Sequence, residues 1–167
     1  MELLPVRLED EAAVLKMYRD PAWGSFEFLY DFDPDRPWAE YVAHLDGARH
    51  GIGLRDGEVA ATFLLAWVGD ELVGRASIRH ELNDFLETYG GHLGYAVAPA
   101  YRNRGYATEM LRQSLVIARA RGITDVLITC DDDNEASGRT IERCGGVFDS
   151  VIPGVDGGPG RRRYWIR

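Results

Sequence analysis

The spacing of apolar residues is helical in the first third of the chain. A short apolar run over residues 3–8 predicts an opening strand, and the acidic residues 9–11 are typical of the first turn of a following helix. Residues 38–45 carry the i, i+3, i+4, i+7 spacing of a helix with one buried face. Gly47 is expected to end this helix, because glycine readily adopts the left-handed conformation of a helix terminus.

From about residue 57 the apolar period shortens to that of β-strands. Residues 59–68 and 72–78 are two apolar runs separated by Gly69-Asp70, which predicts a β-hairpin with a tight turn. The polar segment 79–91 then leads to a third predicted strand, His92–Val97. The hairpin and the third strand together predict an antiparallel part of a sheet.

The last third of the chain alternates helices and strands. We expect a helix over 105–121, a buried strand over 125–130, a helix over 134–144, and closing strands over 147–152 and 163–166. This order predicts a mixed α/β layered fold rather than a repeated βαβ array.

Composition and charge limit the function classes. The chain has 167 residues, 46% hydrophobic and 28% charged, which predicts one folded domain spanning 1–167. It carries 19 basic and 27 acidic residues, for a net charge of −8. So acidic a chain is not built to coat nucleic acid or anionic lipid, and the short run Arg161–Arg163 does not alter that expectation.

Nothing in the sequence predicts a disulfide framework, a metal site or a membrane span. Cys130 and Cys144 lack the further paired ligands of a zinc site, and two thiols in a reducing compartment are expected. The acidic run Asp131–Asn134 resembles a calcium loop only superficially, and a strand-to-helix cap is the preferred interpretation. Without a secretory leader or a long apolar run, we expect a cytoplasmic protein.

The turn over residues 102–108 carries the clearest chemistry. It lies where a predicted strand ends and a helix begins, so unpaired helical N–H groups and the positive helix dipole are available to a phosphate. Arg102 and Arg104 add positive charge, and Gly105 allows close backbone approach. An ordinary basic helix start is the alternative interpretation. A P-loop is excluded because Lys16 is the only lysine, and no dinucleotide fingerprint is present.

Two segments resemble the GCN5-related N-acetyltransferase (GNAT) family. Residues 102–107, Arg-Asn-Arg-Gly-Tyr-Ala, match the family's Gln/Arg-x-x-Gly-x-Gly/Ala signature. Residues 134–137 and 141–146 are similar to its Asn-x-x-Ser/Ala…Gly segment, at the expected distance after a helix and a strand. Around residues 90–95 the chain is most similar to a bacterial branch of acetyltransferases with no assigned substrate.

The resemblance implies a fold, a co-substrate and a reaction. The expected fold is a mixed, mostly antiparallel central sheet flanked by helices. The expected reaction moves an acetyl group from acetyl-CoA, without a metal, to a primary amine that attacks the thioester directly. By resemblance, the pyrophosphate sits on the signature turn. The pantetheine arm lies along one strand, and polar residues of a later helix support the arm by hydrogen bonds. The residues implied are Tyr95, Ala96 and Val97, then Arg102, Asn103, Arg104, Gly105, Tyr106, Ala107 and Thr108, then Asn134 and Ser137.

The acid and base are less defined by the sequence. Many relatives carry a tyrosine after the Asn-x-x-Ser segment to protonate the departing thiolate, but Ile141 holds that position here. Tyr106 or Tyr95 is an alternative acid. His92 is the candidate base, and the competing interpretation is that it is a half-buried strand residue or a hydrogen-bond partner of the substrate. The other base candidates precede it in the chain: Glu81, Asp84 and Glu87.

The acceptor is a small-molecule or peptide amine that the sequence does not identify. We expect it to be bounded by residues 23–45, 79–91 and 155–160, and the acidic residues Asp31, Asp33 and Asp35 offer a mouth for a cationic amine. Exposed strand edges near the C-terminus are compatible with a homodimer. The competing functions are a non-catalytic acyl-CoA-binding domain, and an enzyme that uses a longer acyl group or a hydroxyl acceptor.

Overall fold

The fold is organised around one twisted seven-stranded sheet with the strand order β1-β2-β3-β4-β5-β7-β6. The computed structural model describes residues 1–167, except for the side chain of Asp156. The strands are β1 (Glu2–Pro5), β2 (Ala61–Val68), β3 (Glu71–Arg79), β4 (Leu93–Val97), β5 (Val126–Asp131), β6 (Val147–Ile152) and β7 (Arg161–Ile166). Every strand pairing is antiparallel except that of β4 with β5. The mixed α/β, mostly antiparallel sheet expected from the sequence is therefore confirmed.

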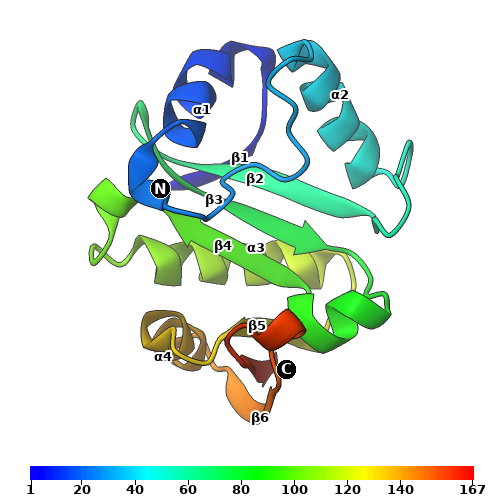
Figure 1. Ribbon diagram of the computed structural model, residues 1–167, viewed down its shortest axis with the longest axis vertical. Helices are drawn as coiled ribbons and strands as arrows, with labels where there is room; N and C mark the ends of the chain where they lie inside the picture. The colour runs from blue at the N-terminus through cyan, green and yellow to red at the C-terminus, as the bar shows by residue number, and fades with distance from the viewer.

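Helices cover both faces of this sheet (Figure 1). The main helices are α1 (Glu11–Tyr18), α2 (Trp38–Arg49), α3 (Tyr106–Ala120) and α4 (Glu135–Arg143). Helices α1 and α2 pack on β3 and β2, whereas α3 packs on β3 and β4 and contacts α4. No helix among the described residues is long and apolar enough to cross a membrane.

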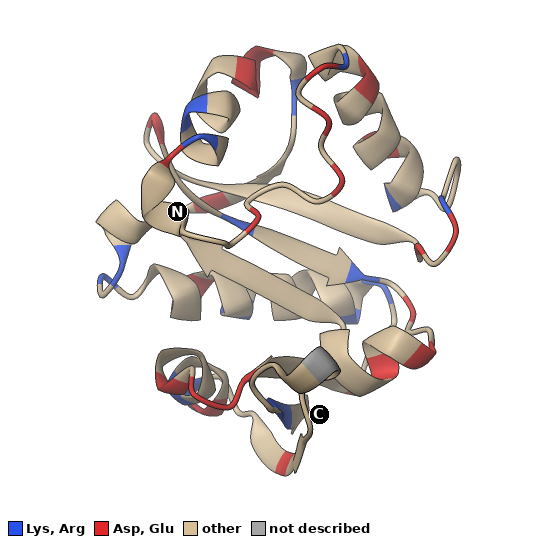
Figure 2. Ribbon diagram, in the orientation of Figure 1, with Lys and Arg blue, Asp and Glu red and all other residues tan. Residues whose placement is uncertain are grey.

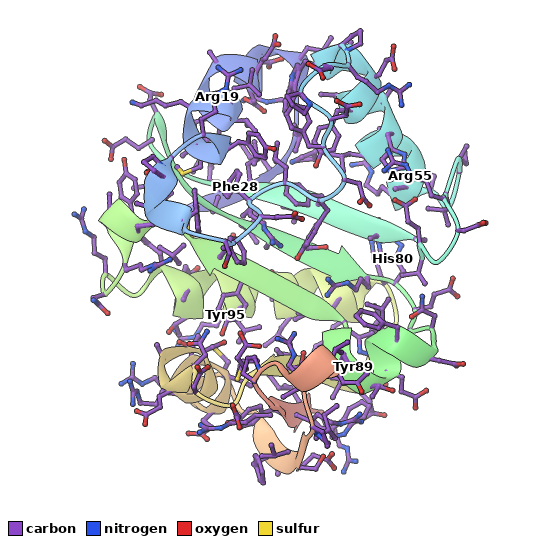
Figure 3. The ribbon with its side chains drawn as sticks, in the orientation of Figure 1. Arg19, Phe28, Arg55, His80, Tyr89 and Tyr95 are labelled. Atoms are coloured by element: carbon purple, nitrogen blue, oxygen red, sulfur yellow. The ribbon has the colours of Figure 1, made fainter. Side chains whose placement is uncertain are left out.

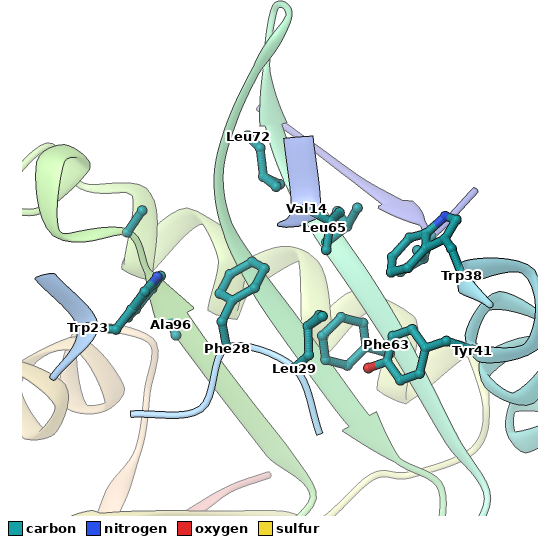
Figure 4. Close-up of a cluster of buried hydrophobic side chains, with 12 residues drawn as sticks. Val14, Trp23, Phe28, Leu29, Trp38, Tyr41, Phe63, Leu65, Leu72 and Ala96 are labelled. Carbon is teal, nitrogen blue, oxygen red and sulfur yellow. The ribbon is translucent and has the colours of Figure 1, made fainter. Parts of the chain in front are cut away.

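Two apolar cores form because β2 is buried on both faces. Alternate side chains of a strand point to opposite faces, so Phe63 and Leu65 join one core while Leu64 joins the other. Figure 4 shows the first core, in which aromatic residues of α2 and of the loop before it pack on the sheet. The second core lies between the sheet and α3. Together the cores fix the sheet between its helical layers.

The strands β4 and β5 separate after a single paired position. Leu93 pairs with Ile128, and no later residue of β4 pairs with β5. On its other side, β4 stays paired with β3 over the whole of Leu93–Val97. One backbone edge of β4 beyond Leu93 is therefore left without a strand partner, and the gap it faces is where the site forms.

One local prediction was wrong, and one short element was not predicted. Helix α2 does not end at Gly47 but continues to Arg49. Gly47 is instead needed for the chain reversal after the helix, because a Cβ there would lie 2.8 Å from the Ile52 carbonyl oxygen. The polar segment before β4 contains a short π-helix, Leu86–Gly90, that no apolar period indicated.

Candidate functional site

A cleft of about 630 Å³ opens between the last residues of β4 and helix α4. It is lined by β4, by the turn before α3, by the first residues of α3, and by α4. The structure brings together here all but Arg104 of the residues expected to hold acetyl-CoA: Tyr95, Ala96, Val97, Arg102, Asn103, Gly105, Tyr106, Ala107, Thr108, Asn134 and Ser137.

The N-terminus of α3 faces this cleft without a capping side chain. Gly105 occupies the N-cap position with φ 82°, and Asn103 has φ 62°, so both lie in the left-handed region. The first N–H groups of a helix have no intrahelical acceptor. With glycine at the cap, no side chain satisfies them, so the turn presents donors and a positive dipole to the cleft.

The two signature arginines take different positions. Arg102 lines the cleft, and its Nε donates to the Val97 carbonyl at 3.4 Å. Arg104 instead donates to the Ala100 carbonyl at 3.2 Å, and its guanidinium lies 5.5 Å from the Tyr101 ring centre. Neither arginine forms a salt bridge within the described part of the chain. Arg102 is therefore the signature cation that is placed for an anion in the cleft.

On the opposite wall, α4 is tied to β4 through Ser137. The Asn134 side-chain oxygen accepts from the Ser137 N–H at 3.1 Å and caps α4, as expected of a strand-to-helix cap. The hydroxyls of Ser137 and Tyr95 are 2.9 Å apart. Burial raises the pKa of Tyr95 to about 12, so its phenol stays protonated at neutral pH. Figure 3 shows Tyr95 between β4 and α4.

The residues considered for the acid differ in access to the cleft. Ile141 is fully buried in the core beside α3, so its position offers no proton donor. Tyr106 and Tyr95 both line the cleft, and only the hydroxyl of Tyr95 has a hydrogen-bond partner among the described residues. The structure thus leaves both candidate phenols in the cleft, where Tyr101 is a third lining tyrosine.

His92, the candidate base, lies outside the cleft lining at the junction of β4 and β5. Its ring Nδ1 accepts a hydrogen bond from the Leu127 N–H at 3.0 Å, and the backbone N–H of His92 donates to the Leu127 carbonyl at 2.7 Å. Burial, together with the charge of Arg79, lowers the pKa of His92. A neutral imidazole whose Nδ1 accepts carries its hydrogen on Nε2. In this arrangement neither nitrogen offers a free lone pair.

Sequence reasoning missed part of the lining. Trp23 and Phe26 enter from the loop before α2, whose irregular Pro- and aromatic-rich sequence predicts no position. Arg139 and Arg143 enter from α4. Their i, i+4 spacing was a usable signal, because it places two cations on one helix face beside the Asn134 cap.

A second cavity of about 200 Å³ lies on the face of the sheet covered by α2. Two of the segments expected to bound an acceptor meet there, through Tyr30, Asp31 and His44 on one side and Arg79 and Leu86 on the other. The third segment, 155–160, contributes no lining residue among those described, and the side chain of Asp156 lies outside the described part of the chain.

The expected acidic mouth is only partly formed. Asp31 lines the second cavity, whereas Asp33 accepts a hydrogen bond from the Asp35 N–H at 2.9 Å within its own turn. Figure 2 shows acidic residues spread along this loop rather than gathered at one point. Within the described residues, no group of three acidic, His or Cys side chains is arranged to hold a metal ion.

Comparisons with known proteins bear on the whole chain. Residues 1–147 match the family described as "Acetyltransferase (GNAT) domain". No curated protein matches the sequence significantly. Solved structures share the fold at low sequence identity.

One similar structure is the microcin C7 self-immunity acetyltransferase MccE with acetyl-CoA and AMP (16% identity, TM-score 0.68, 98% of this chain and 90% of that one). A second is the ribosomal L7/L12 α-N-protein acetyltransferase RimL with coenzyme A (18% identity, TM-score 0.68, 98% of this chain and 92% of that one). A third is spermidine N-acetyltransferase from Vibrio cholerae with CoA and spermine (14% identity, TM-score 0.68, 99% of this chain and 94% of that one).

Proposed function

The chain belongs to the GNAT acetyltransferase family, and from that membership we propose that it transfers an acetyl group from acetyl-CoA to a primary amine. One observation carries the proposal: the unpaired edge of β4 and the uncapped N-terminus of α3 line the same cleft. An extended pantetheine arm can form backbone hydrogen bonds with an unpaired strand edge. A phosphate can accept hydrogen bonds from the free N–H groups of a helix N-terminus.

The residues of the cleft have separate binding tasks. The N–H groups of Gly105, Tyr106, Ala107 and Thr108, with Arg102, hold the pyrophosphate. The backbone of Tyr95–Val97 pairs with the pantetheine arm. The structures of MccE and RimL contain acetyl-CoA and coenzyme A respectively, which supports this choice of co-substrate.

In the proposed reaction the amine attacks the thioester carbonyl directly. A C–N bond forms, the C–S bond breaks, and the sulfur leaves as a thiolate. Main-chain N–H groups of β4 stabilise the negative charge that develops on the carbonyl oxygen. A thiol with a pKa of about 8.5 leaves without strong acid assistance, so Ile141 in place of a tyrosine does not prevent the reaction.

The attacking amine must first lose its ammonium proton. Since the Nδ1 of His92 already accepts from Leu127, we assign His92 a positioning role at the β4–β5 junction. The proton then passes to water in the cleft. We also place the enzyme in a reducing compartment, the cytoplasm, because both of its cysteines, Cys130 and Cys144, are free thiols.

A non-catalytic acyl-CoA-binding domain is the competing function, and the buried Ile141 favours it. Turnover separates the two. The purified chain is incubated with acetyl-CoA and a panel of primary amines while free thiol is measured. Amine-dependent thiol release supports the enzyme; saturable acetyl-CoA binding without release over the whole panel supports the binding domain.

A further inference from the structure

Three polar side chains converge over Gly94 on the face of the sheet opposite α3. From the position that a Cβ would take at Gly94, the Tyr30 hydroxyl is 3.5 Å away, Arg79 Nη1 3.6 Å and Arg75 Nη1 3.8 Å. Gly94 pairs with Ser77 of β3, so Arg75 and Arg79 flank it at i−2 and i+2 along that strand. We call Tyr30, Arg75, Arg79 and Gly94 the Gly94 niche.

Arg75 is a buried cation that has no carboxylate partner among the side chains that the structure describes. It is 1% exposed, and its contacts are the Tyr30 hydroxyl at 2.6 Å and the Glu27 carbonyl at 3.4 Å. Its Nε has no hydrogen-bond partner within the described part of the chain. Its guanidinium lies 4.1 Å from the Tyr30 ring centre and 5.2 Å from that of Phe26. Contacts with aromatic faces offset only part of the desolvation cost of a buried cation. The Arg75 guanidinium can therefore still form a favourable interaction with an anion.

Arg79 is in a similar situation at the edge of the second cavity. In the described residues, the hydrogen bonds of its Nη1 go to the carbonyls of Gly90 and Gly91, both at 3.3 Å. Together with Tyr30 it lines the cavity, so an entering molecule meets the guanidinium and the phenol side by side.

The acidic residues of this cavity are already engaged. Glu58 lies 3.3 Å from His44 and accepts from the Arg55 N–H at 2.7 Å. Asp31 lies 3.7 Å from the Arg55 guanidinium. Neither carboxylate pairs with Arg75 or Arg79, so the niche has an excess of positive charge in a chain whose net charge is −8.

The remaining ionisable neighbours agree with a positive potential. Burial alone disfavours ionisation of Tyr30, yet the charges of Arg75 and Arg79 outweigh it and lower the pKa of this phenol. Beside them, His92 has its pKa lowered by burial and by Arg79. Arg161 is also nearby but forms an ion pair with Asp131.

We propose that the Gly94 niche binds an oxyanion of the acceptor, so that the acceptors are amines that carry a carboxylate or a phosphate. This inference rests on the proposed function, because it takes the amine to be the attacking group. Gly94 directly precedes the β4 edge assigned to the thioester arm, so an acceptor anchored in the niche places its amine beside that edge. The same positive charge favours the neutral, nucleophilic form of the amine.

The first test measures anion binding without any reaction. Sodium acetate and inorganic phosphate are titrated separately into the full chain at constant ionic strength in chloride, and backbone amide resonances are followed by NMR. We expect saturable shifts at Gly94 and its neighbours with at least one of the two anions, and the effective anion identifies the acceptor group. Arg79→Gln should weaken that binding at least tenfold.

Two variants keep this test decisive. Gly94→Ala places a methyl group in ordinary contact with the three polar tips, so it should fold and still weaken anion binding. Arg36→Gln, which removes an exposed arginine paired with Glu40, should bind like the wild type. If neither anion perturbs the wild type more than chloride does, or if Arg36→Gln weakens binding as much as Arg79→Gln, the inference is overturned.

The second test uses matched acceptors. An amino acid, its carboxamide and the corresponding amine lacking the carboxyl group are compared as acceptors, alongside a phosphate-bearing amine. We expect kcat/KM to be at least tenfold higher for an anionic acceptor, mainly through KM, and this preference to disappear in Arg79→Gln. Equal use of charged and uncharged amines by an active enzyme overturns the inference and leaves the proposed function standing. Absence of acetyl-CoA binding overturns the proposed function, and the anion titration then decides the niche alone.

Discussion

The Nδ1 atom of His92 accepts a hydrogen bond from the backbone N–H of Leu127 at 3.0 Å. This contact joins the start of β4 to β5 next to the one position at which the strands pair, Leu93 with Ile128. The two strands separate immediately beyond this pair. The His92–Leu127 contact therefore fixes the point at which the gap between β4 and β5 begins. His92 therefore supports the geometry of the site from outside it.

The positioning role predicts that an asparagine can replace His92. The Oδ1 of asparagine can accept from the Leu127 N–H but cannot act as a general base. His92→Asn should keep kcat within about threefold, whereas His92→Ala leaves a buried N–H unpaired and should lower the free energy of unfolding by about 1–3 kcal/mol. Steady-state kinetics and urea unfolding check both. A folded but inactive His92→Asn would restore His92 as the base.

The same histidine predicts a pH dependence of stability. Burial lowers the pKa of His92 and of His80, so both bind protons more weakly in the folded chain than in the unfolded chain. Their contribution to stability is complete above the unfolded value of about 6.5 and is lost as the pH falls toward the folded pKa. Urea unfolding between pH 7.5 and 5 should show a smaller decline for His92→Asn than for the wild type. An identical decline would contradict the assignment.

The Tyr95–Ser137 contact predicts a difference between the two phenols considered as the acid, Tyr95 and Tyr106. Tyr95→Phe removes the hydroxyl that Ser137 contacts and should lower the free energy of unfolding by about 1 kcal/mol. Tyr106→Phe removes a hydroxyl with no hydrogen-bond partner among the described residues and should leave stability unchanged. Thermal or urea unfolding of the pair measures this. If thiolate departs unassisted, both variants retain turnover; a selective loss of kcat in one of them identifies it as the acid.

Gly74 predicts a strong effect of a single methyl group on the site. A Cβ there would lie 2.2 Å from the Ala96 carbonyl oxygen and 3.1 Å from the Met110 side chain, so β4 would have to move. We expect Gly74→Ala to cost about 1–3 kcal/mol in stability and to weaken acetyl-CoA binding. Gly24→Ala is a useful comparison, because a Cβ there meets nothing within 4 Å, although its φ of 64° adds local strain. Equal acetyl-CoA binding by both variants would contradict a role for β4 placement.

Much of the fold and the turn that lines the cleft before α3 could be predicted from the sequence, because both depend on local signals. Alternating apolar runs located the hairpin, and the turn ending in Gly105 follows from residue types at fixed spacing. The Gly94 niche could not be predicted this way. It joins Tyr30, from an irregular loop, to two arginines on β3, and only strand register and loop packing place them over a glycine of β4. The hydrogen bond between His92 and Leu127 likewise depends on the parallel pairing of β4 with β5, which no local sequence pattern predicts.

The most direct test of the central claim is a calorimetric titration of acetyl-CoA into the wild type, Gly105→Asp and Gly122→Asp. The two glycines lie at opposite ends of α3 with φ of 82° and 85°, and a Cβ at either position meets nothing within 4 Å, so the backbone penalties match. Only Gly105 lines the cleft, and a carboxylate there would oppose the pyrophosphate. We predict binding by the wild type and Gly122→Asp and a loss of at least tenfold in affinity for Gly105→Asp. No binding by the folded wild type, or equal affinity of all three proteins, would contradict the account.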